Sequence, residues 1–164
     1  MKMNRKGFTL IELLIVVAII GIIVAIAIPN LLNAIQRAKQ RRTMGDIRTI
    51  ATAVEAYSVD LNRYPPAAGF TIPGGMTVAA GKTLSVMEGY VAPTYLRKVP
   101  LTDGWGSWFI FSSTNTGTDY LLASFGKNGT EDAPATGWGA TTNFNADIIY
   151  VDGQFVNYPE GVQN

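Results

Sequence analysis

The chain contains no cysteine and no histidine among its 164 residues. These absences exclude a disulfide framework, thiolate or imidazole metal ligands, a cysteine nucleophile and a Ser-His-Asp triad. The carboxylates are scattered along the chain, and the sequence shows neither a phosphate-binding glycine loop nor a nucleophile elbow. The sequence therefore predicts a protein that is not an enzyme.

Basic residues are scarce in the C-terminal part of the chain. After Lys98 the only one is Lys127. The same segment holds seven acidic residues, namely Asp103, Asp119, Glu131, Asp132, Asp147, Asp152 and Glu160. Because a nucleic-acid-binding face needs clustered lysine and arginine, we predict that nucleic acid is not a partner of this half.

Charge is nearly absent from residues 8–28, FTLIELLIVVAIIGIIVAIAI, which follow the basic leader MKMNRKG. As an α-helix that rises about 1.5 Å per residue, this run matches the roughly 30 Å hydrocarbon core of a bilayer. It is longer than the roughly 7 to 15 apolar residues of a secretory signal, and no small-residue cleavage site follows it. We therefore predict a single-pass membrane helix, with any cleavage site in front of it.

Glu12 is the only charged residue within this run. A carboxylate at the centre of a spanning helix costs about 2.5 to 3.5 kcal/mol, so such a residue is a candidate for a function. Its place near the start of the helix lowers that cost, because a helix N-terminus favours negative charge. Two interpretations stay open from the residue alone: a charge tolerated at the membrane interface, or a carboxylate that awaits a cation.

Residues 31–61 continue the helix and give it one apolar face. Ile47, Ile50, Ala51, Val54 and Leu61 follow the i, i+3, i+4 spacing of such a face. We predict one long helix over residues 8–61, whose second half packs on a globular head. Its basic run, residues 37–42, is expected to solvate the helix where it leaves the membrane, to touch lipid phosphates, or to form weak ion pairs with the acidic heads of other subunits.

Residues 62–164 predict a small β-rich head. Pro65 and Pro66 end the long helix, and strand signals follow at residues 76–79, 108–112, 119–124, 148–151 and 154–156. The Asp152-Gly153 pair predicts a type I′ hairpin turn, and residues 83–90 predict a short helix. The fold class is therefore α+β, with the long N-terminal helix packed on an antiparallel sheet of three or four strands.

The junction of leader and apolar run resembles the class III leader of type IV pilins and of the pseudopilins of type II secretion. The likeness rests on Gly7, Phe8, a glutamate five residues past the junction and the unbroken apolar helix. It implies the pilin fold, cleavage between Gly7 and Phe8 by a prepilin peptidase, and N-methylation of Phe8. It also implies that Glu12 pairs with the new amino group of Phe8 on a neighbouring subunit, so that cleavage creates the cation needed for assembly.

Gly21 and Pro29 interrupt the membrane half of the helix. Pro29 has no N–H to donate to the carbonyl of Ala25, and Gly21 adds backbone freedom. One interpretation is a kink of the kind that membrane helices tolerate. The other, which the pilin resemblance implies, is a segment that stretches or melts when the subunit leaves the bilayer for the filament.

Two segments of the head narrow the resemblance to the major pseudopilin of type II secretion systems. Residues 95–106, YLRKVPLTDGWG, resemble that family's Y-L-x-x-x-P-x-D-P-W-G segment, with Gly104 in place of its second proline. Residues 120–129, YLLASFGKNG, with ADI at 146–148, are similar to its Y-x-L-x-S-x-G-x-D-G loop and A-D-I, with Asn128 in place of aspartate. In that family the loop binds calcium, which implies oxygen ligands from Asn128, Asp147 and either Glu131 or Asp132. A solvated acidic loop without metal is the alternative.

The resemblance divides the chain into a leader (residues 1–7), a transmembrane or filament-core half-helix (8–30), an amphipathic half-helix (31–61) and a head (62–164). It implies a structural subunit of a pilus-like filament, most closely the major pseudopilin of a type II secretion pseudopilus that drives protein export. The implied partners are further copies in a helical filament, the prepilin peptidase, an assembly platform with its ATPase, minor pilins or pseudopilins, and the membrane.

The implied location is the inner membrane, with one membrane pass, the head in the periplasm and the filament in the periplasm or on the cell surface. Two alternatives to the pseudopilus interpretation remain open. One is the major subunit of a surface type IV pilus for adhesion or motility, and the other is a membrane-anchored envelope binding module.

Overall fold

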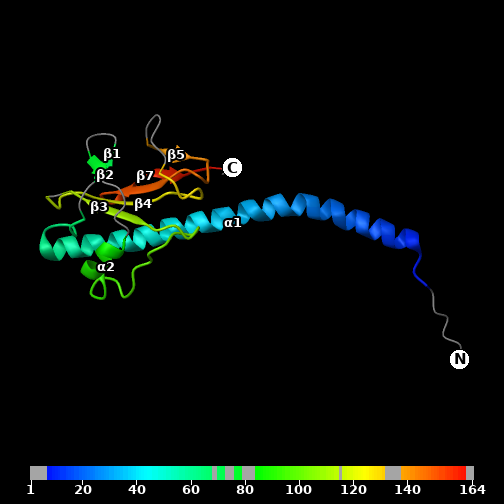
Figure 1. Ribbon diagram of the computed structural model, residues 1–164, viewed down its shortest axis with the longest axis horizontal. Helices are drawn as coiled ribbons and strands as arrows, with labels where there is room; N and C mark the ends of the chain where they lie inside the picture. The colour runs from blue at the N-terminus through cyan, green and yellow to red at the C-terminus, as the bar shows by residue number, and fades with distance from the viewer. Residues whose placement is uncertain are drawn as a thin grey trace, which may run out of the picture. The chain divides into compact units, whose positions relative to one another are not determined.

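The structure is a computed structural model that describes residues 7–67, 70–72, 76–78, 84–114, 116–131 and 138–161 (Figure 1). It divides into two compact units, residues 1–35 and 36–164. The helix α1, Leu10–Leu61, runs through the boundary between them. By length and composition α1 is the one helix in the described part of the chain that could cross a membrane. The predicted long helix is confirmed, although it begins two residues later than expected.

The second half of α1 buries one face in the head. Its buried residues recur every three or four positions, as one side of a helix requires. They are Gln40, Thr43, Ile47, Ile50, Ala51, Ala53, Val54 and Tyr57. The predicted face is thus correct except at Leu61, which is the last helical residue and is half exposed. The helix ends where Asn62 takes a left-handed conformation (φ 55°) in front of Pro65 and Pro66.

The head contains a five-stranded sheet in the order β3-β4-β6-β7-β5. The strands are β3 (Ile110–Ser113), β4 (Tyr120–Ser124), β5 (Ala140–Thr141), β6 (Ile148–Val151) and β7 (Gln154–Pro159). All neighbouring pairs are antiparallel except β5 and β7, which pair in parallel over two residues. The α+β prediction is confirmed, and the sheet has one strand more than expected because β5 joins its edge.

Each face of this sheet carries its own apolar cluster. The face toward α1 includes Phe111, Tyr120 and Leu122, which pack with Ile47 and other residues of the helix. The opposite face includes Ile110, Leu121, Ala123, Ile149 and Val151, with Phe125, Trp138 and Val156 packed against them. Burial on both faces explains why β4 and β6 are nearly continuous apolar runs and do not alternate strictly between apolar and polar residues.

Tyr120, the first residue of β4, links the sheet to α1 by a hydrogen bond. Its hydroxyl donates a hydrogen bond to Glu55 Oε1 at 2.7 Å, and its ring lies 4.6 Å from the ring of Tyr64. Burial and the Glu55 carboxylate raise the pKa of Tyr120 well above its usual range. The phenol therefore stays protonated, and stays a donor, throughout the physiological pH range.

Two smaller elements complete the head. The short helix α2, Ser85–Val91, buries Met87 and Val91 in the same core, and the predicted helix at 83–90 is confirmed within a residue or two. Strands β1 (Phe70–Ile72) and β2 (Met76–Val78) form a separate antiparallel pair. The sequence predicted β2 but not β1, and Ala79 of the predicted strand lies outside the described residues.

The β6–β7 turn has the predicted type I′ character, with Asp152 at φ 46° and Gly153 at φ 93°. Asp152 Oδ1 accepts a hydrogen bond from the Tyr120 backbone N–H at 2.9 Å. Desolvation raises the pKa of the Asp152 carboxyl, the Tyr120 N–H opposes that rise, and the negative charge of Asp119 adds to it. The ionised carboxylate therefore weakens the fold at neutral pH.

We predict that Asp152→Asn stabilises the head at pH 7 by about 0.5 kcal/mol, since asparagine keeps the acceptor oxygen, removes the charge and suits a type I′ turn. Because a raised folded-state pKa stabilises the fold only in acid, the advantage of asparagine should shrink as pH falls toward the carboxyl's unfolded pKa. Urea unfolding of the chain from residue 33 onward, which contains every core residue, measures both effects. A stability difference between Asp152→Asn and wild type that stays the same at all pH values would contradict this account.

Candidate processing and assembly site

The start of α1 is closed by Thr9 and Glu12. The Thr9 backbone N–H and hydroxyl both donate to Glu12 Oε2, at 2.8 and 2.6 Å, and the Glu12 N–H donates to Thr9 Oγ1 at 3.3 Å. This is a capping box, in which a threonine and a glutamate three residues later satisfy each other's backbone groups. It explains why α1 begins at Leu10 and leaves Gly7, Phe8 and Thr9 outside the helix. The sequence analysis missed Thr9, although the T-x-x-E pattern is a signal for it.

The predicted processing residues lie in an accessible segment. Phe8 is 77% exposed, and Gly7 and Thr9 are exposed as well. Glu12 is also exposed, one helical turn into α1. The structure thus brings Glu12 next to the predicted junction between Gly7 and Phe8, at the very end of the apolar helix.

Gly21 and Pro29 both lie inside α1, which continues through them. A Cβ added at Gly21 would meet no heavy atom within 4 Å, so close packing does not require glycine there. The predicted stretching or melting of this segment stays a prediction, and so does the tolerated kink.

The basic run of α1 splits into residues with different surroundings. Arg42 Nε lies 3.4 Å from Asp46 Oδ2, which is an i, i+4 ion pair on the helix surface. The backbone of Lys39 lies under the 103–107 turn of the head, because a Cβ added at Gly104 would overlap the Lys39 carbonyl oxygen. Arg37 and Arg41 line a cavity beside the end of β7.

The 103–107 turn joins the head to α1. The Gly104 N–H donates to Thr43 Oγ1 at 2.9 Å, and Thr43 Oγ1 in turn donates to the Lys39 carbonyl at 2.9 Å. Trp105 Nε1 donates to Gln36 Oε1 at 2.7 Å. Proline has neither the N–H nor the room for this contact, so the departure from the family pattern at Gly104 has a structural reason: the chain gains a hydrogen bond to its own helix.

We predict that Gly104→Ala lowers the free energy of unfolding of the head by about 1 to 3 kcal/mol. The added Cβ would lie 2.8 Å from the Lys39 carbonyl carbon, which belongs to helix backbone and cannot move aside cheaply. Urea unfolding of the segment from residue 33 onward measures the loss. Gly89→Ala is the matched control, since its Cβ would meet nothing within 4 Å; equal effects of the two substitutions would contradict the close contact.

The predicted calcium loop is packed against the segment that contains Asp147. The Lys127 N–H donates to the Phe144 carbonyl at 3.0 Å, and a Cβ at Gly126 would lie 2.6 Å from the Asn145 carbonyl oxygen. Asn128 Oδ1 accepts the Thr130 N–H at 3.3 Å on the surface, whereas Asp147 is only 3% exposed. The fold thus brings the two segments together, as the resemblance implied.

The donors of this loop fit calcium in kind, because they are all oxygen atoms. Glu131 is exposed, and Asp132 lies outside the described residues. Within the described ranges no group of three or more Asp, Glu, His or Cys is placed to hold a metal ion. The described side chains alone therefore do not make a complete site, and calcium stays a prediction.

Comparison with known sequences matches both parts of this arrangement. The profile described as "Prokaryotic N-terminal methylation motif" matches residues 2–28, which include the predicted junction, the capping box and the apolar half of α1. The profile described as "Type II secretion system (T2SS), protein G" matches residues 30–139. Strands β5, β6 and β7 lie beyond that range.

Curated relatives agree with the two profiles. Three proteins named type II secretion system core protein G, from Pectobacterium carotovorum subsp. carotovorum, Escherichia coli (strain K12) and Pseudomonas aeruginosa, are each 30% identical to this chain. The alignments cover 79%, 83% and 79% of this chain and 73%, 92% and 89% of those proteins. A chain with a methylation motif, a helix of membrane-spanning length and an α+β head is of the pilin-like class. This chain belongs to the type II secretion system protein G family.

Proposed function

We propose that this protein is the major pseudopilin of a type II secretion system, a structural and not a catalytic subunit that polymerises into a filament. The observation that carries the proposal is the exposure of the apolar half of α1. Every large apolar side chain of that half is at least 43% exposed, from Leu10 at 83% to Val24 at 43%. Such a surface needs hydrocarbon around it, which is either lipid or the helices of other copies. The relatives support the pseudopilus and support neither the surface pilus nor the envelope binding module.

The same helix would serve in both environments. In the bilayer the 21-residue run 8–28 spans the hydrocarbon core, and in the filament core its apolar side chains pack against those of other copies outside lipid. We propose that residues 1–7 stay on the cytoplasmic side and that the head lies in the periplasm. An assembly platform with its ATPase would then move the subunit from the bilayer into the filament. Minor pseudopilins would take part in the same assembly.

Cleavage between Gly7 and Phe8 would prepare the subunit for assembly. It removes the three basic residues of the leader and leaves a free amino group on Phe8, close to the capping box, which a separate methyl transfer would then methylate. Both hydrogen bonds that the Glu12 carboxylate accepts from Thr9 go to Oε2, so a neighbour's amino group could approach the other oxygen, Oε1, without breaking the capping box. The pairing of two ions in a water-poor core would fix the axial register of one helix against the next.

Peptide mass spectrometry at native expression tests this proposal. An N-methylated Phe8 peptide should be found in washed envelopes and be scarce in material sheared from the cell surface. The same peptide abundant in the sheared fraction would favour a surface pilus instead. An uncut leader in both fractions would refute the processing and the filament.

We also propose that the loop at residues 124–131 and the segment at 143–147 bind calcium through Asn128, Asp147, Glu131 or Asp132 and backbone carbonyls. The support is the packing of the two segments and their all-oxygen donors. Calcium would supply positive charge that holds the two segments together.

We predict that the segment from residue 33 onward melts at a higher temperature in calcium than in chelator, by several degrees at saturating ion, because a ligand at about 100 times its Kd adds about 2.7 kcal/mol. Asn128→Asp restores a carboxylate and should enlarge the shift. Identical melting curves in calcium and in chelator, for wild type and for Asn128→Asp alike, would show that the loop does not bind calcium.

A further inference from the structure

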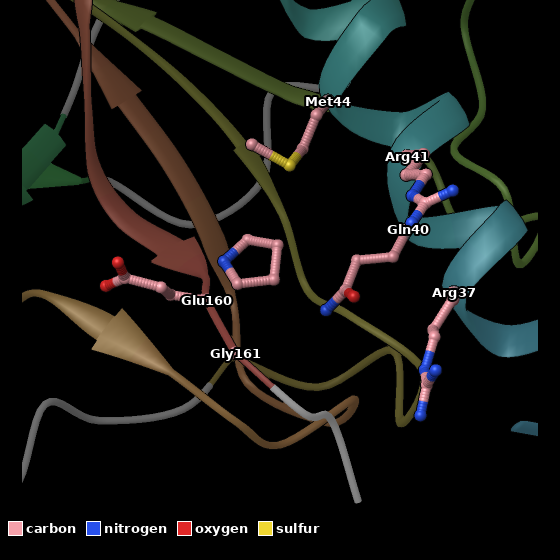
Figure 2. A pocket seen from close by; sticks show the side chains of 7 residues that line it. Arg37, Gln40, Arg41, Met44, Glu160 and Gly161 are labelled. Carbon is pink, nitrogen blue, oxygen red and sulfur yellow. The ribbon is translucent and has the colours of Figure 1, made fainter.

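A cavity of about 180 Å³ lies between α1 and the end of β7 (Figure 2). Arg37, Gln40, Arg41 and Met44 line it from the helix, and residues 159–161 line it from the strand. The cavity lies wholly in the unit formed by residues 36–164. Neither the capping box nor the calcium loop contributes to it, so it is a separate feature of the molecule.

The lining of the cavity carries a net positive charge. Arg37 and Arg41 are one helical turn apart, so their side chains project from the same side of α1, and both are exposed. Glu160 is the one carboxylate among the lining residues, and Figure 2 shows its side chain directed away from Arg37 and Arg41. Two arginine side chains therefore line the cavity from the helix, with a single acid on the strand side. A guanidinium fork fits a phosphate in two-point contact, which makes phosphate the best-matched anion.

The place of the cavity along the chain favours the phosphate of a lipid. Arg37 follows Ile28, the last residue of the apolar run, by nine residues, which is about 13 Å along a helix. Leu31, Leu32 and Ile35 are exposed and extend the apolar surface toward Arg37. The headgroup layer adds about 5 to 7 Å on each side of the hydrocarbon core, and an arginine side chain can reach back toward it.

We propose that this cavity binds the phosphate of an anionic phospholipid while the subunit is in the bilayer. Arg37 and Arg41 hold the phosphate, the exposed Leu31 and Ile35 on the membrane side of Arg37 border the apolar part of the lipid, and Met44 lines the end of the cavity farther from the membrane. The proposal rests on the membrane insertion proposed above and adds a specific lipid contact to it. A subunit that leaves the bilayer gives up this contact, so the cavity links lipid binding to extraction.

The test uses the full chain in nanodiscs of phosphatidylcholine with added phosphatidylglycerol. Native mass spectrometry counts the phosphatidylglycerol molecules that stay with the protein after release from the disc. Arg37→Gln with Arg41→Gln should weaken retention roughly 30-fold, because each basic side chain at an anionic surface is worth about fivefold. Arg97→Gln with Lys98→Gln removes the same charge from an exposed part of the head and should leave retention unchanged.

Two further variants separate charge, geometry and folding. Arg37→Lys with Arg41→Lys keeps the charge and should retain lipid at an intermediate level, because lysine lacks the guanidinium fork. Met44→Trp narrows the cavity with both arginines in place and should also weaken retention. Thermal melting shows whether each variant folds, and recovery in the nanodisc fraction reports insertion, so failure of the membrane proposal is seen separately.

Three outcomes would overturn the proposal. Equal lipid retention by wild type and by the double glutamine variant means that the cavity binds no lipid. Inorganic phosphate that displaces phosphatidylglycerol at a similar concentration means that the ligand is free phosphate. A photocrosslinker at Met44 that captures only a second copy of the chain, and no lipid, means that the cavity is a subunit contact.

Discussion

Replacement of Glu12 by alanine is expected to leave membrane insertion and leader cleavage intact and to reduce filament yield more than about tenfold. A contact worth only about 1.4 kcal/mol already changes an equilibrium tenfold, and opposite charges 4 Å apart at an effective dielectric constant near 20 attract by about 4 kcal/mol. In the alanine variant, each subunit added to the filament lacks this ion pair. Filament yield per cleaved subunit, measured by fractionation and immunoblotting, gives the result.

Glu12 also caps its own helix, so this prediction needs a variant that separates capping from assembly. Thr9→Val removes the hydroxyl that contacts Glu12 and keeps the backbone N–H, which costs about 1 kcal/mol of helix capping. It should reduce filament yield far less than Glu12→Ala. Equal losses in the two variants would mean that Glu12 acts through the capping box alone, and normal yield from Glu12→Ala would exclude any role for it in assembly.

Replacement of Asp103 by alanine is expected to destabilise the head more than any other single change considered. Asp103 is 2% exposed, and its Oδ1 accepts the N–H groups of Trp105 and Ser107, each at 2.9 Å. Its Oδ2 accepts the Ser124 hydroxyl at 2.7 Å, so the carboxylate joins the 103–107 turn to the end of β4. Each donor left unsatisfied costs about 1 to 3 kcal/mol, and the sum is a large part of a domain's 5 to 15 kcal/mol.

Asp103→Asn is the matched control for that prediction. Asparagine keeps one oxygen for the two backbone N–H groups, and the Ser124 hydroxyl can rotate to accept from the new amide. In urea unfolding of the segment from residue 33 onward, Asp103→Asn should lower the free energy of unfolding by less than half as much as Asp103→Ala does. Equal losses in the two variants would show that the two backbone hydrogen bonds contribute little to stability.

The regular parts of the fold were predictable because local patterns determine them. The apolar run and the spacing of Ile47, Ile50 and Val54 predicted α1, and Asp152-Gly153 predicted the turn between β6 and β7. Strand β5 was not predicted, since its two residues pair in parallel with β7 and carry no pattern of their own. Thr43 is buried on the apolar face of α1 because it receives a hydrogen bond from a residue 61 positions away, which no local pattern reveals.

The candidate site was predictable to a similar extent. Glu12 stands out as a lone charge in an apolar run, and its position next to Gly7 and Phe8 follows from chain order. The different surroundings of the basic residues were not predictable. Only the packed head shows that Arg42 pairs with Asp46 while Arg37 and Arg41 line a cavity.

Protein export tests the central claim most directly. In the organism that encodes this chain, deletion of its gene should leave exported proteins folded in the periplasm, and wild type in trans should return them to the medium while Glu12→Ala does not. The ratio of exoprotein in the medium to exoprotein in the periplasm is the measurement. A normal ratio in the deletion strain, with any related subunits also deleted, would contradict the role of this protein as the major pseudopilin.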